Sequence, residues 1–546
     1  MSVIPIPGSS SETWPLPRLE RPALPWRPRW SRWLLPAAAL LVAALMLLPP
    51  IYLVVRTSQS GAAALEILTR ASTLAALGRT TVLMAAVTLA SAALAVPLAW
   101  LTTCSDLPGR RFWTVSLALP LALPSFVVAY LFVSILGPRG LVQQLVEPLT
   151  GWQRLPDLYG FPSAFIVLTL ISYPFVFLGV RAALLRQDPS LAEAARSLGL
   201  SSRRVFWRVT LPQLRPAIIA GSLLVSLYVL RDFGAVTLLR YNTFTSLIYL
   251  QYRSFLDRSL AAALALILVG ITAAILLAEA RTRGRAAYAR SSAGAPRQPR
   301  PVALGWLRWP ALALAGLVMT LGLLLPAAGL GYWLWRGLDE GRVLATLARP
   351  AWNSFGVSLG AAGLAVMAAV PVAVTSVRRP GRLATFIERL AYSGFALPGI
   401  VVALAMVFFG ITYARSLYQT LAMLLAAYVI LFLPQAVGAL RAAMLQVPPG
   451  LEEAGRSLGA NPLAVFGRVT LPLLRPGLLA GGGLVFLTAM KELPAALIVS
   501  PIGFRTLATS VWGSISEAFF AEAAAPALLL ILLSSIPLAV LSLREK

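Results

Sequence analysis

The chain has 546 residues, of which 58% are apolar and 12% are charged, and its formal net charge is +26. A mean hydropathy of +0.79 excludes a soluble globular protein, because so few charges could not cover the surface of so long a chain. There is one cysteine, Cys104, and no histidine, which excludes intrachain disulfides, histidine-ligated metals and Ser-His-Asp catalysis. We therefore expect neither a metal site nor catalytic residues on this chain.

Apolar stretches recur from the N-terminal region to the C-terminus, each about 20 residues long and able to cross a hydrocarbon core of roughly 30 Å as a helix. Twelve are expected, near 33–55, 74–101, 112–136, 161–183, 217–239, 260–280, 307–335, 352–377, 390–411, 417–440, 477–500 and 522–543. Continuous apolar stretches are not typical of a β-barrel, whose short strands alternate. The predicted fold class is an all-α polytopic membrane protein with twelve transmembrane helices.

Positive charge gathers in alternate loops between these stretches. Arginines are dense before residue 33 and in 110–111, 181–215, 281–300 and 378–389. The positive-inside rule places these loops, and both termini, in the cytoplasm. Because a basic surface also suits anionic headgroups, we expect membrane lipid as a partner and no nucleic acid.

The sequence contains an internal repeat. Glu193–Pro216 reads "EAARSLGLSSRRVFWRVTLPQLRP" and Glu453–Pro476 reads "EAGRSLGANPLAVFGRVTLPLLRP", with 16 of 24 positions identical. Upstream, "AVPLA" and "LPSFVVA" in the first half match "AVPVA" and "LPGIVVA" in the second, after a change of register that falls on the loop around 137–160. Six helices per half is an even number, so the halves have the same orientation and form parallel repeats.

This repeat divides the chain into four parts. We expect a cytoplasmic tail over 1–32, a first repeat over 33–280 with a core of about 74–280, a cytoplasmic linker over 281–306, and a second repeat over 307–546 with a core of about 350–543. The linker is rich in Arg, Gly, Ser and Pro and has no apolar period.

The duplicated stretch joins the fourth and fifth helices of each half on the cytoplasmic side. In the first copy, Pro189 suits an opening turn, Gly199 interrupts the helical pattern, and Ser201 or Ser202 could cap a second short helix that ends near Pro212. Such a unit could simply pack against the membrane domain. Two symmetric, protruding copies favour instead two docking points for a partner.

Charged pairs fall inside the fifth and eleventh apolar stretches: Arg231-Asp232 and, at the matching place, Lys491-Glu492. Charges at mid-bilayer cost roughly 2.5–3.5 kcal/mol each, so they should face the interior or each other. One interpretation is ion pairing that locks helix packing. The other places them at the seam between the halves, where they line or gate a translocation pathway.

The duplicated stretch resembles the EAA loop of membrane subunits of binding-protein-dependent ABC importers, a pattern of E-A-A, three residues, G, and a run ending in L-P. The resemblance covers nearly the whole chain after its tail and implies a type I ABC importer permease fold, in which this loop is the coupling helix in a groove of an ATPase subunit. Carried over by position, it implies that ATPase coupling falls to Glu193, Ala194, Ala195, Gly199, Glu453, Ala454 and Gly459. The second copy departs from the pattern at Gly455.

The resemblance also implies partners and a location. These are two copies of a cytoplasmic ATPase, which carry the ATP and magnesium, and a periplasmic or lipid-anchored binding protein, all at a bacterial inner membrane. No cofactor is expected on this chain, because its two lysines, Lys491 and Lys546, do not lie in a phosphate-binding loop. The segments "RDFGAVTLL" and "KELPAALIVSP" look like the corresponding segments of fused ferric-iron permeases. Thiamine, polyamine and phosphonate permeases are the alternatives.

A major-facilitator-type secondary transporter, also six helices plus six, is the alternative from a different class. "DLPGRR" after the second stretch is similar to that class's basic loop but lacks the Arg after the Asp. A facilitator carries its main cytoplasmic loop between helices six and seven, whereas this chain adds matching loops after helices four and ten. The loop placement favours the importer.

Overall fold

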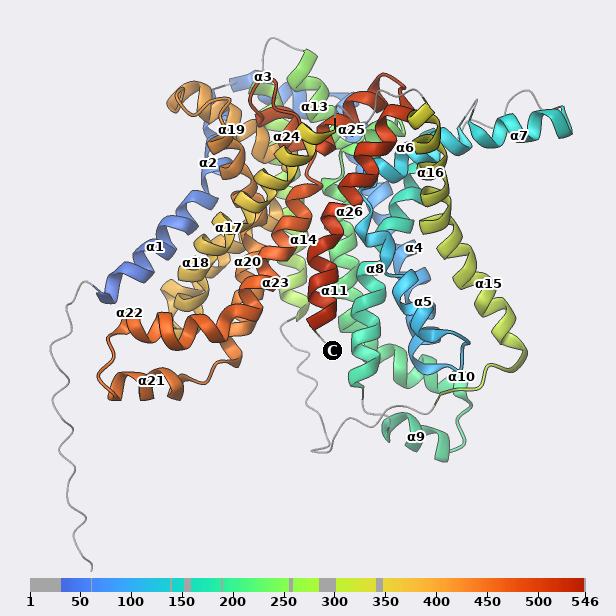
Figure 1. The fold of residues 1–546 in the computed structure, drawn as a ribbon, viewed down its shortest axis with the longest axis horizontal. Coiled ribbons are helices and arrows are strands. Elements are labelled where there is room, and N and C mark those ends of the chain that lie inside the picture. The colour runs from blue at the N-terminus through green and yellow to red at the C-terminus, as the bar shows by residue number, and fades with distance from the viewer. Residues whose placement is uncertain are drawn as a thin grey trace, which may run out of the picture.

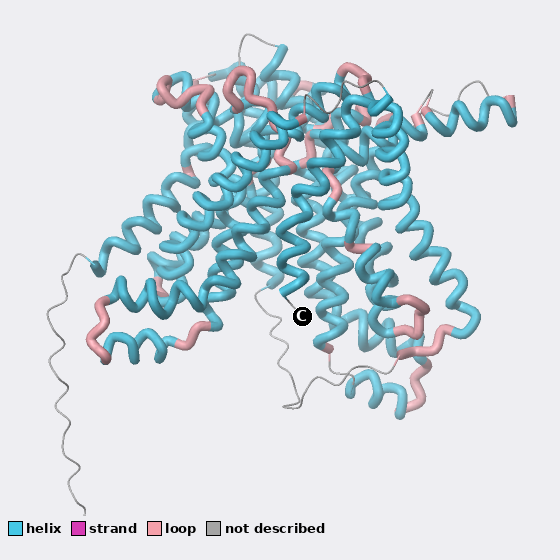
Figure 2. Tube along the Cα trace, in the orientation of Figure 1, coloured by secondary structure: helices cyan, strands magenta, loops and turns pink. Residues whose placement is uncertain are grey.

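The computed structural model describes residues 31–59, 61–137, 140–151, 159–187, 190–254, 259–283, 301–339 and 347–544. Most of the predicted tail and linker, Pro189 and Lys546 lie outside these residues. Within them the chain is helical, with short loops and a single isolated bridge between Ser105 and Val302 (Figure 2). The predicted all-α class is confirmed.

The helices of the first half begin after the tail. They are α1 (Ser31–Met46), α2 (Leu48–Ser58), α3 (Gly61–Thr69), α4 (Ala71–Cys104), α5 (Arg110–Ser116), η1 (Leu119–Ala122), α6 (Ser125–Leu136), α7 (Leu141–Thr150), α8 (Phe161–Arg186), α9 (Ser190–Ser197), α10 (Ser202–Val205), η2 (Phe206–Thr210), α11 (Leu211–Arg231), α12 (Gly234–Leu238), α13 (Phe244–Ser254) and α14 (Ser259–Arg283).

The second half repeats this order from α4 onward, without a counterpart of α7. Its helices are η3 (Gly305–Leu307), α15 (Arg308–Met319), η4 (Thr320–Leu324), α16 (Leu325–Asp339), α17 (Ala348–Arg378), α18 (Arg382–Tyr392), η5 (Ser393–Ala396), α19 (Gly399–Tyr413), α20 (Leu421–Gln446), α21 (Pro449–Ser457), α22 (Pro462–Val465), η6 (Phe466–Thr470), α23 (Leu471–Met490), α24 (Pro494–Val499), α25 (Leu507–Ser516) and α26 (Phe520–Arg544).

All twelve predicted apolar stretches are found on helices. Among the described residues, ten helices are long and apolar enough to cross a membrane, one further pair (382–396 and 399–413) is bent by 104°, and Phe520–Ser535 of α26 is a shorter apolar helix. The expectation of unbroken helices over 112–136 and 390–411 is wrong. Pro120, Pro124 and Pro398 break them, because proline lacks an N–H and disfavours helical geometry just before it.

Each half packs around three long helices. In the first half α4, α8 and α11 contact one another, and in the second half α17, α20 and α23 do the same. Pro97 and Pro371 stand at matching places inside α4 and α17. The doubled sequence therefore folds into two copies of one helical core.

The first helices of the two halves are exchanged. α1 packs against α17 and α18 of the second half, while α2 packs against both α14 of its own half and α19 of the second. Tyr52 on α2 donates a hydrogen bond to the carbonyl oxygen of Phe408 (3.0 Å). Conversely, α15 lies against the first half, where Ala311 packs with Leu101 and Leu107. α16 packs against α26 of its own half and also against α6, and the indole of Trp333 donates to Ser134 (3.0 Å). Figure 1 shows blue α1 beside gold α17 and yellow-green α16 beside cyan α6. This exchange ties the halves together.

Candidate functional site

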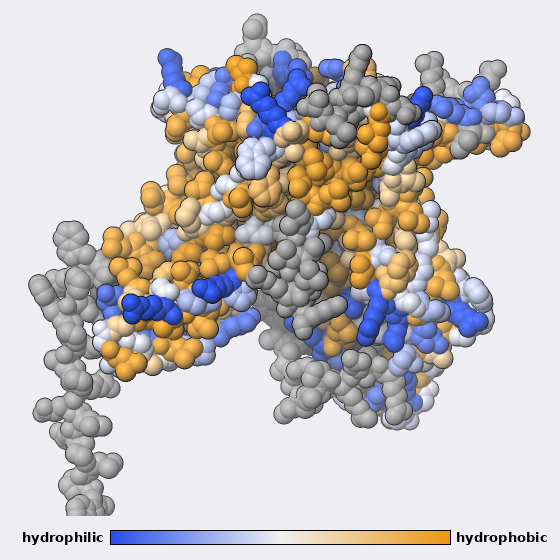
Figure 3. All heavy atoms as spheres, in the orientation of Figure 1, coloured by the Kyte–Doolittle hydropathy of each residue, from blue (hydrophilic) through white to orange (hydrophobic). Residues whose placement is uncertain are grey.

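Two projections stand on one face of the molecule, α9 with α10 under the first half and α21 with α22 under the second (Figure 1). We call residues 190–210 the first elbow and residues 449–470 the second elbow. Figure 3 shows the molecule separating into two lobes toward this face, each lobe carrying one elbow. The duplicated sequence is therefore placed at two matching positions.

Each elbow turns at a glycine in the left-handed region, with φ of +85° at Gly199 and +84° at Gly459. The amide of Gly199 donates to the carbonyl of Arg196 (2.9 Å) and that of Leu200 to Ala195 (3.2 Å). The second elbow repeats both bonds at Gly459 and Ala460. This is a Schellman motif, which needs a residue tolerant of positive φ. A Cβ at either glycine would meet nothing within 4 Å, so backbone geometry and not space calls for glycine.

We expected the second helix of the first elbow to end near Pro212. Instead, the second helix of each elbow continues past its Leu-Pro. It continues through a π-turn, η2 in the first copy and η6 in the second, into α11 and α23. A proline at 212 cannot donate to the carbonyl of Arg208, and a wider turn accommodates the missing bond. Each elbow is thus covalently and helically continuous with the fifth transmembrane helix.

The predicted coupling residues divide into two groups. Glu193, Ala194, Glu453 and Ala454 are exposed, whereas Ala195 is 8% exposed. At the position that matches Ala195, a Cβ on Gly455 would lie 3.2 Å from the side chain of Val465. The third small residue therefore lies where the two helices of an elbow pack together.

Exposed leucines are the elbow residues that sequence reasoning missed. Leu198 is 82% exposed and its repeat partner Leu458 is 87% exposed, and Leu191 and Leu451 form a second matched, exposed pair. Large apolar side chains exposed at twin positions indicate an interaction surface. The repeated "SLG" in both copies was the signal that could have found them.

We expected the charged pairs to lie inside continuous helices. They lie instead at breaks in those helices. Arg231 ends α11, and Lys491 and Glu492 follow α23. Asp232 is 8% exposed, and its Oδ1 accepts hydrogen bonds from the amides of Ala235 (3.0 Å) and Val236 (3.2 Å) in α12.

Glu492 accepts a hydrogen bond at the start of α24, as Asp232 does at the start of α12. Its Oε1 accepts from the amide of Ala495 (3.2 Å). The same carboxylate lies against Gly399, the first residue of α19, where a Cβ would collide with it. Each acidic residue thus starts a new short helix and satisfies amides that a break would leave unpaired.

The basic residues reach across the molecule. Lys491 Nζ donates to the carbonyl of Leu121 in η1 of the first half (3.2 Å). Arg231 of the first half and Glu492 of the second interact electrostatically. We call these two breaks, residues 231–234 and 491–494, the seam.

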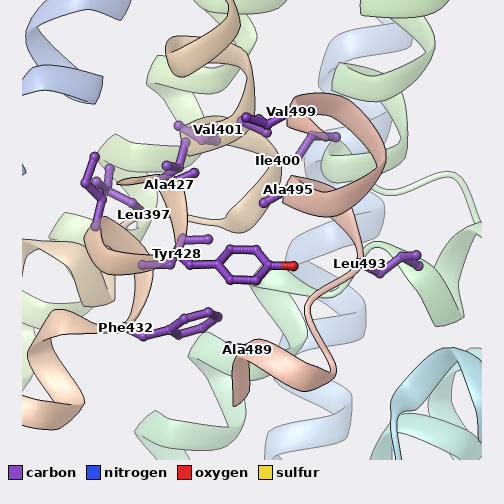
Figure 4. Close-up of a cluster of buried hydrophobic side chains, with 14 of the residues drawn as sticks. Leu397, Ile400, Val401, Ala427, Tyr428, Phe432, Ala489, Leu493, Ala495 and Val499 are labelled. Atoms are coloured by element: carbon purple, nitrogen blue, oxygen red, sulfur yellow. The ribbon is translucent and has the colours of Figure 1, made fainter. Parts of the chain in front are cut away.

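The seam is embedded in apolar packing. Gly234 stands close to the side chain of Leu493, and the rings of Phe233 and Trp512 lie 5.4 Å apart. Figure 4 shows the buried Tyr428 pointing its hydroxyl toward the chain between Ala489 and Leu493. Arg231, Lys491 and Glu492 are half-buried, and their interactions connect the two halves. Asp232 is buried and contacts α12 of its own half.

Two repeated helical cores, exchanged first helices, polar breaks where the halves meet and twin elbows define a polytopic membrane transport subunit. Residues 95–281 and 361–544 both match the family described as "Binding-protein-dependent transport system inner membrane component", and the chain belongs to this family. It is a multi-pass inner-membrane permease of the ABC importer class, which works with a substrate-binding protein and an ATPase. The major-facilitator alternative is wrong.

Known relatives agree with this assignment. The chain is 34% identical over 517 residues to the Fe(3+)-transport system permease protein FbpB 2 of Haemophilus influenzae, which covers 93% of this chain and 98% of that protein. It is 26% identical over 476 residues to the probable ABC transporter permease protein y4fN of Sinorhizobium fredii, covering 80% and 81%. The molybdenum transport system permease protein ModB of Escherichia coli is 36% identical over 137 residues, covering 25% of this chain and 58% of that protein.

Proposed function

We propose that the chain carries ferric iron across the inner membrane, after a periplasmic or lipid-anchored binding protein delivers it. The support is the similarity to a permease named for Fe(3+) transport along nearly the whole of both chains. The relative named for molybdenum transport matches only a quarter of this chain. Thiamine, polyamine and phosphonate remain the alternative cargoes.

The elbows are the proposed docking points for two copies of the ATPase, which would hold the ATP and magnesium. The observation that carries this proposal is the exposure of Leu198 and Leu458 at repeat-matched tips of the elbow face. Glu193 and Glu453 stand beside them as exposed acidic groups that could pair with a basic groove. Closure of the ATPases would move both elbows, and α11 and α23, continuous with the elbows, would carry that motion to the seam.

The seam is the proposed gate. Arg231, Asp232, Lys491 and Glu492 lie at the far ends of the two helices that start in the elbows. Interactions across the seam close the pathway there, while the lobes separate on the elbow face (Figure 3). This arrangement supports a resting state that is open toward the elbows and closed at the seam.

The elbow face is the proposed cytoplasmic face, with both termini on it. The C-terminal end of α26 points toward that face (Figure 1), and the arginine-rich ends of α8 and α17 lie near the elbows. The proposed domain organisation is a tail (1–32), two repeats (33–280 and 307–546) and a linker (281–306) between them.

The docking proposal is tested by co-purification of the ATPase in mild detergent. The variant L198S/L458S is expected to retain at least tenfold less ATPase. Two leucines that become buried when the ATPase docks contribute several kcal/mol to the binding free energy. The matched control is I502S, since Ile502 is 86% exposed in the loop after α24. Retention of the ATPase by the elbow variant at the control level would contradict the proposal.

The cargo is tested in proteoliposomes that contain the permease, its ATPase and its binding protein. ATP-driven uptake of radioactive ferric iron is expected, with no uptake of thiamine, spermidine or a phosphonate under the same conditions. Uptake of one of these three and not of iron would contradict the assignment.

A further inference from the structure

The second elbow is fastened by a buried carboxylate. Glu452, in the first turn of α21, is 6% exposed. Its Oε1 accepts hydrogen bonds from Arg378 Nε (3.2 Å), Arg378 Nη2 (3.1 Å) and Thr470 Oγ1 (3.0 Å), and Arg456 Nη2 reaches Oε2 at 3.4 Å. Arg378 also donates to the carbonyl of Val447 (2.9 Å).

These contacts join three separate elements. Arg378 is the last residue of α17, Glu452 belongs to α21, and Thr470 ends the π-turn that leads into α23. Arg378 further holds the chain just after α20 through Val447. One carboxylate therefore connects the second elbow to the ends of the long helices of its half.

The first elbow lacks the residues for this network. Glu193 matches Glu453, so the position that matches Glu452 is Ala192. α4 corresponds to α17, and it ends at Cys104 where α17 ends at Arg378. Thr210 does match Thr470, so only the carboxylate and the cation differ.

The first half has another connection nearby. Gln187 Nε2 donates to Gln213 Oε1 (2.7 Å) and joins the end of α8 to the start of α11. The second half has Val447 and Leu473 at those positions. Gln187 and Gln213 both lie outside α9, whereas Glu452 is part of α21.

The chemistry of the network makes it stiff. A buried carboxylate is stable only when its charge is paired and its oxygens are hydrogen-bonded, and removing one partner leaves an uncompensated charge. The position in the first turn of α21 adds a favourable interaction with the helix dipole. Movement of α21 away from α17 would therefore be costly.

We propose that Glu452 and Arg378 are a positioning pair that fixes the second coupling helix to α17, so that the two elbows are mechanically unequal. The second elbow moves as one body with α17. The inference depends on the proposed role of the elbows as ATPase docking points. Its consequence is that loss of the pair uncouples transport from ATP hydrolysis more than it weakens ATPase binding.

The test measures amide hydrogen exchange in the complete complex, together with iron transported per ATP hydrolysed. In E452L and in R378M, the amides of α21 are expected to exchange roughly tenfold faster, with the α9 amides unchanged. E452Q keeps an acceptor for Thr470 and Arg378 and should show a smaller increase. The double variant R378M/E452L should be no faster than either single variant, since both remove one interaction.

The matched control is E388L, which removes a different ion pair of the same half. Glu388 Oε1 lies 3.0 Å from Arg441 Nε, between α18 and α20. Faster α21 exchange in E388L, or unchanged exchange in E452L and R378M, overturns the anchoring. Faster α21 exchange with an unchanged ratio of transported iron to ATP instead overturns the proposed function of the elbow.

Discussion

At the residue scale, the elbow glycines show that a repeated residue can be required for its backbone and not for its size. Gly199 and Gly459 have φ near +85° in open surroundings. A β-branched residue there costs about 1–2 kcal/mol per site, while Asn tolerates the same conformation. We expect G199V/G459V to lose most ATP-driven uptake and G199N/G459N to keep most of it, at equal protein levels in the membrane. Equal uptake by both variants would contradict this role.

Gly399 at the seam has the opposite requirement, namely space. A Cβ there would collide with Glu492, so G399A should lower the stability of the detergent-solubilised permease by about 1–3 kcal/mol, measured by thermal unfolding. The control is G363A in α17, where a Cβ meets nothing within 4 Å and Ala should be neutral or slightly stabilising. A midpoint for G399A that equals that of the control would show that the carboxylate is not held against α19.

At the scale of elements, the sequence predicted the location of twelve apolar stretches that lie on helices and of both elbows. The length and apolar composition of each stretch predict a helix locally. The repeat showed which helices of the two halves correspond. It did not predict the breaks after α11 and α23, because Arg231-Asp232 and Lys491-Glu492 interrupt runs whose apolar composition continues on both sides. Whether an acidic side chain caps a new helix depends on neighbours such as Ser125 or Gly399, which lie far away in the sequence.

The repeat also placed a length change near 137–160, and the structure has α7 there. Figure 1 shows α7 projecting from the body, and its packing is chiefly against α6. Replacement of the exposed residues 147–150 by a Gly-Ser linker should therefore change the stability by less than about 1 kcal/mol and leave ATPase co-purification intact. A large fall in the unfolding midpoint would mean that α7 belongs to the core.

At the scale of the whole molecule, the two sequence repeats are not two independent bodies. α1 lies on the second half and α15 on the first, while α2 and α16 contact both halves. This exchange left no local signal, since the faces of a helix in lipid are apolar whichever neighbour they meet. The halves 1–283 and 301–546, expressed as separate chains, should therefore co-purify when expressed together and be degraded when expressed alone. Stable accumulation of either half alone would contradict the exchange.

The central claim is that the elbows transmit work done by a separate ATPase to the seam. The most direct measurement is iron uptake into proteoliposomes that hold the permease, its ATPase and its binding protein, with the wild-type chain and with L198S/L458S. The account predicts ATP-dependent uptake by the wild type and at least a tenfold loss in the elbow variant. Uptake driven by an ion gradient through the permease alone, and equal for both chains, would contradict it.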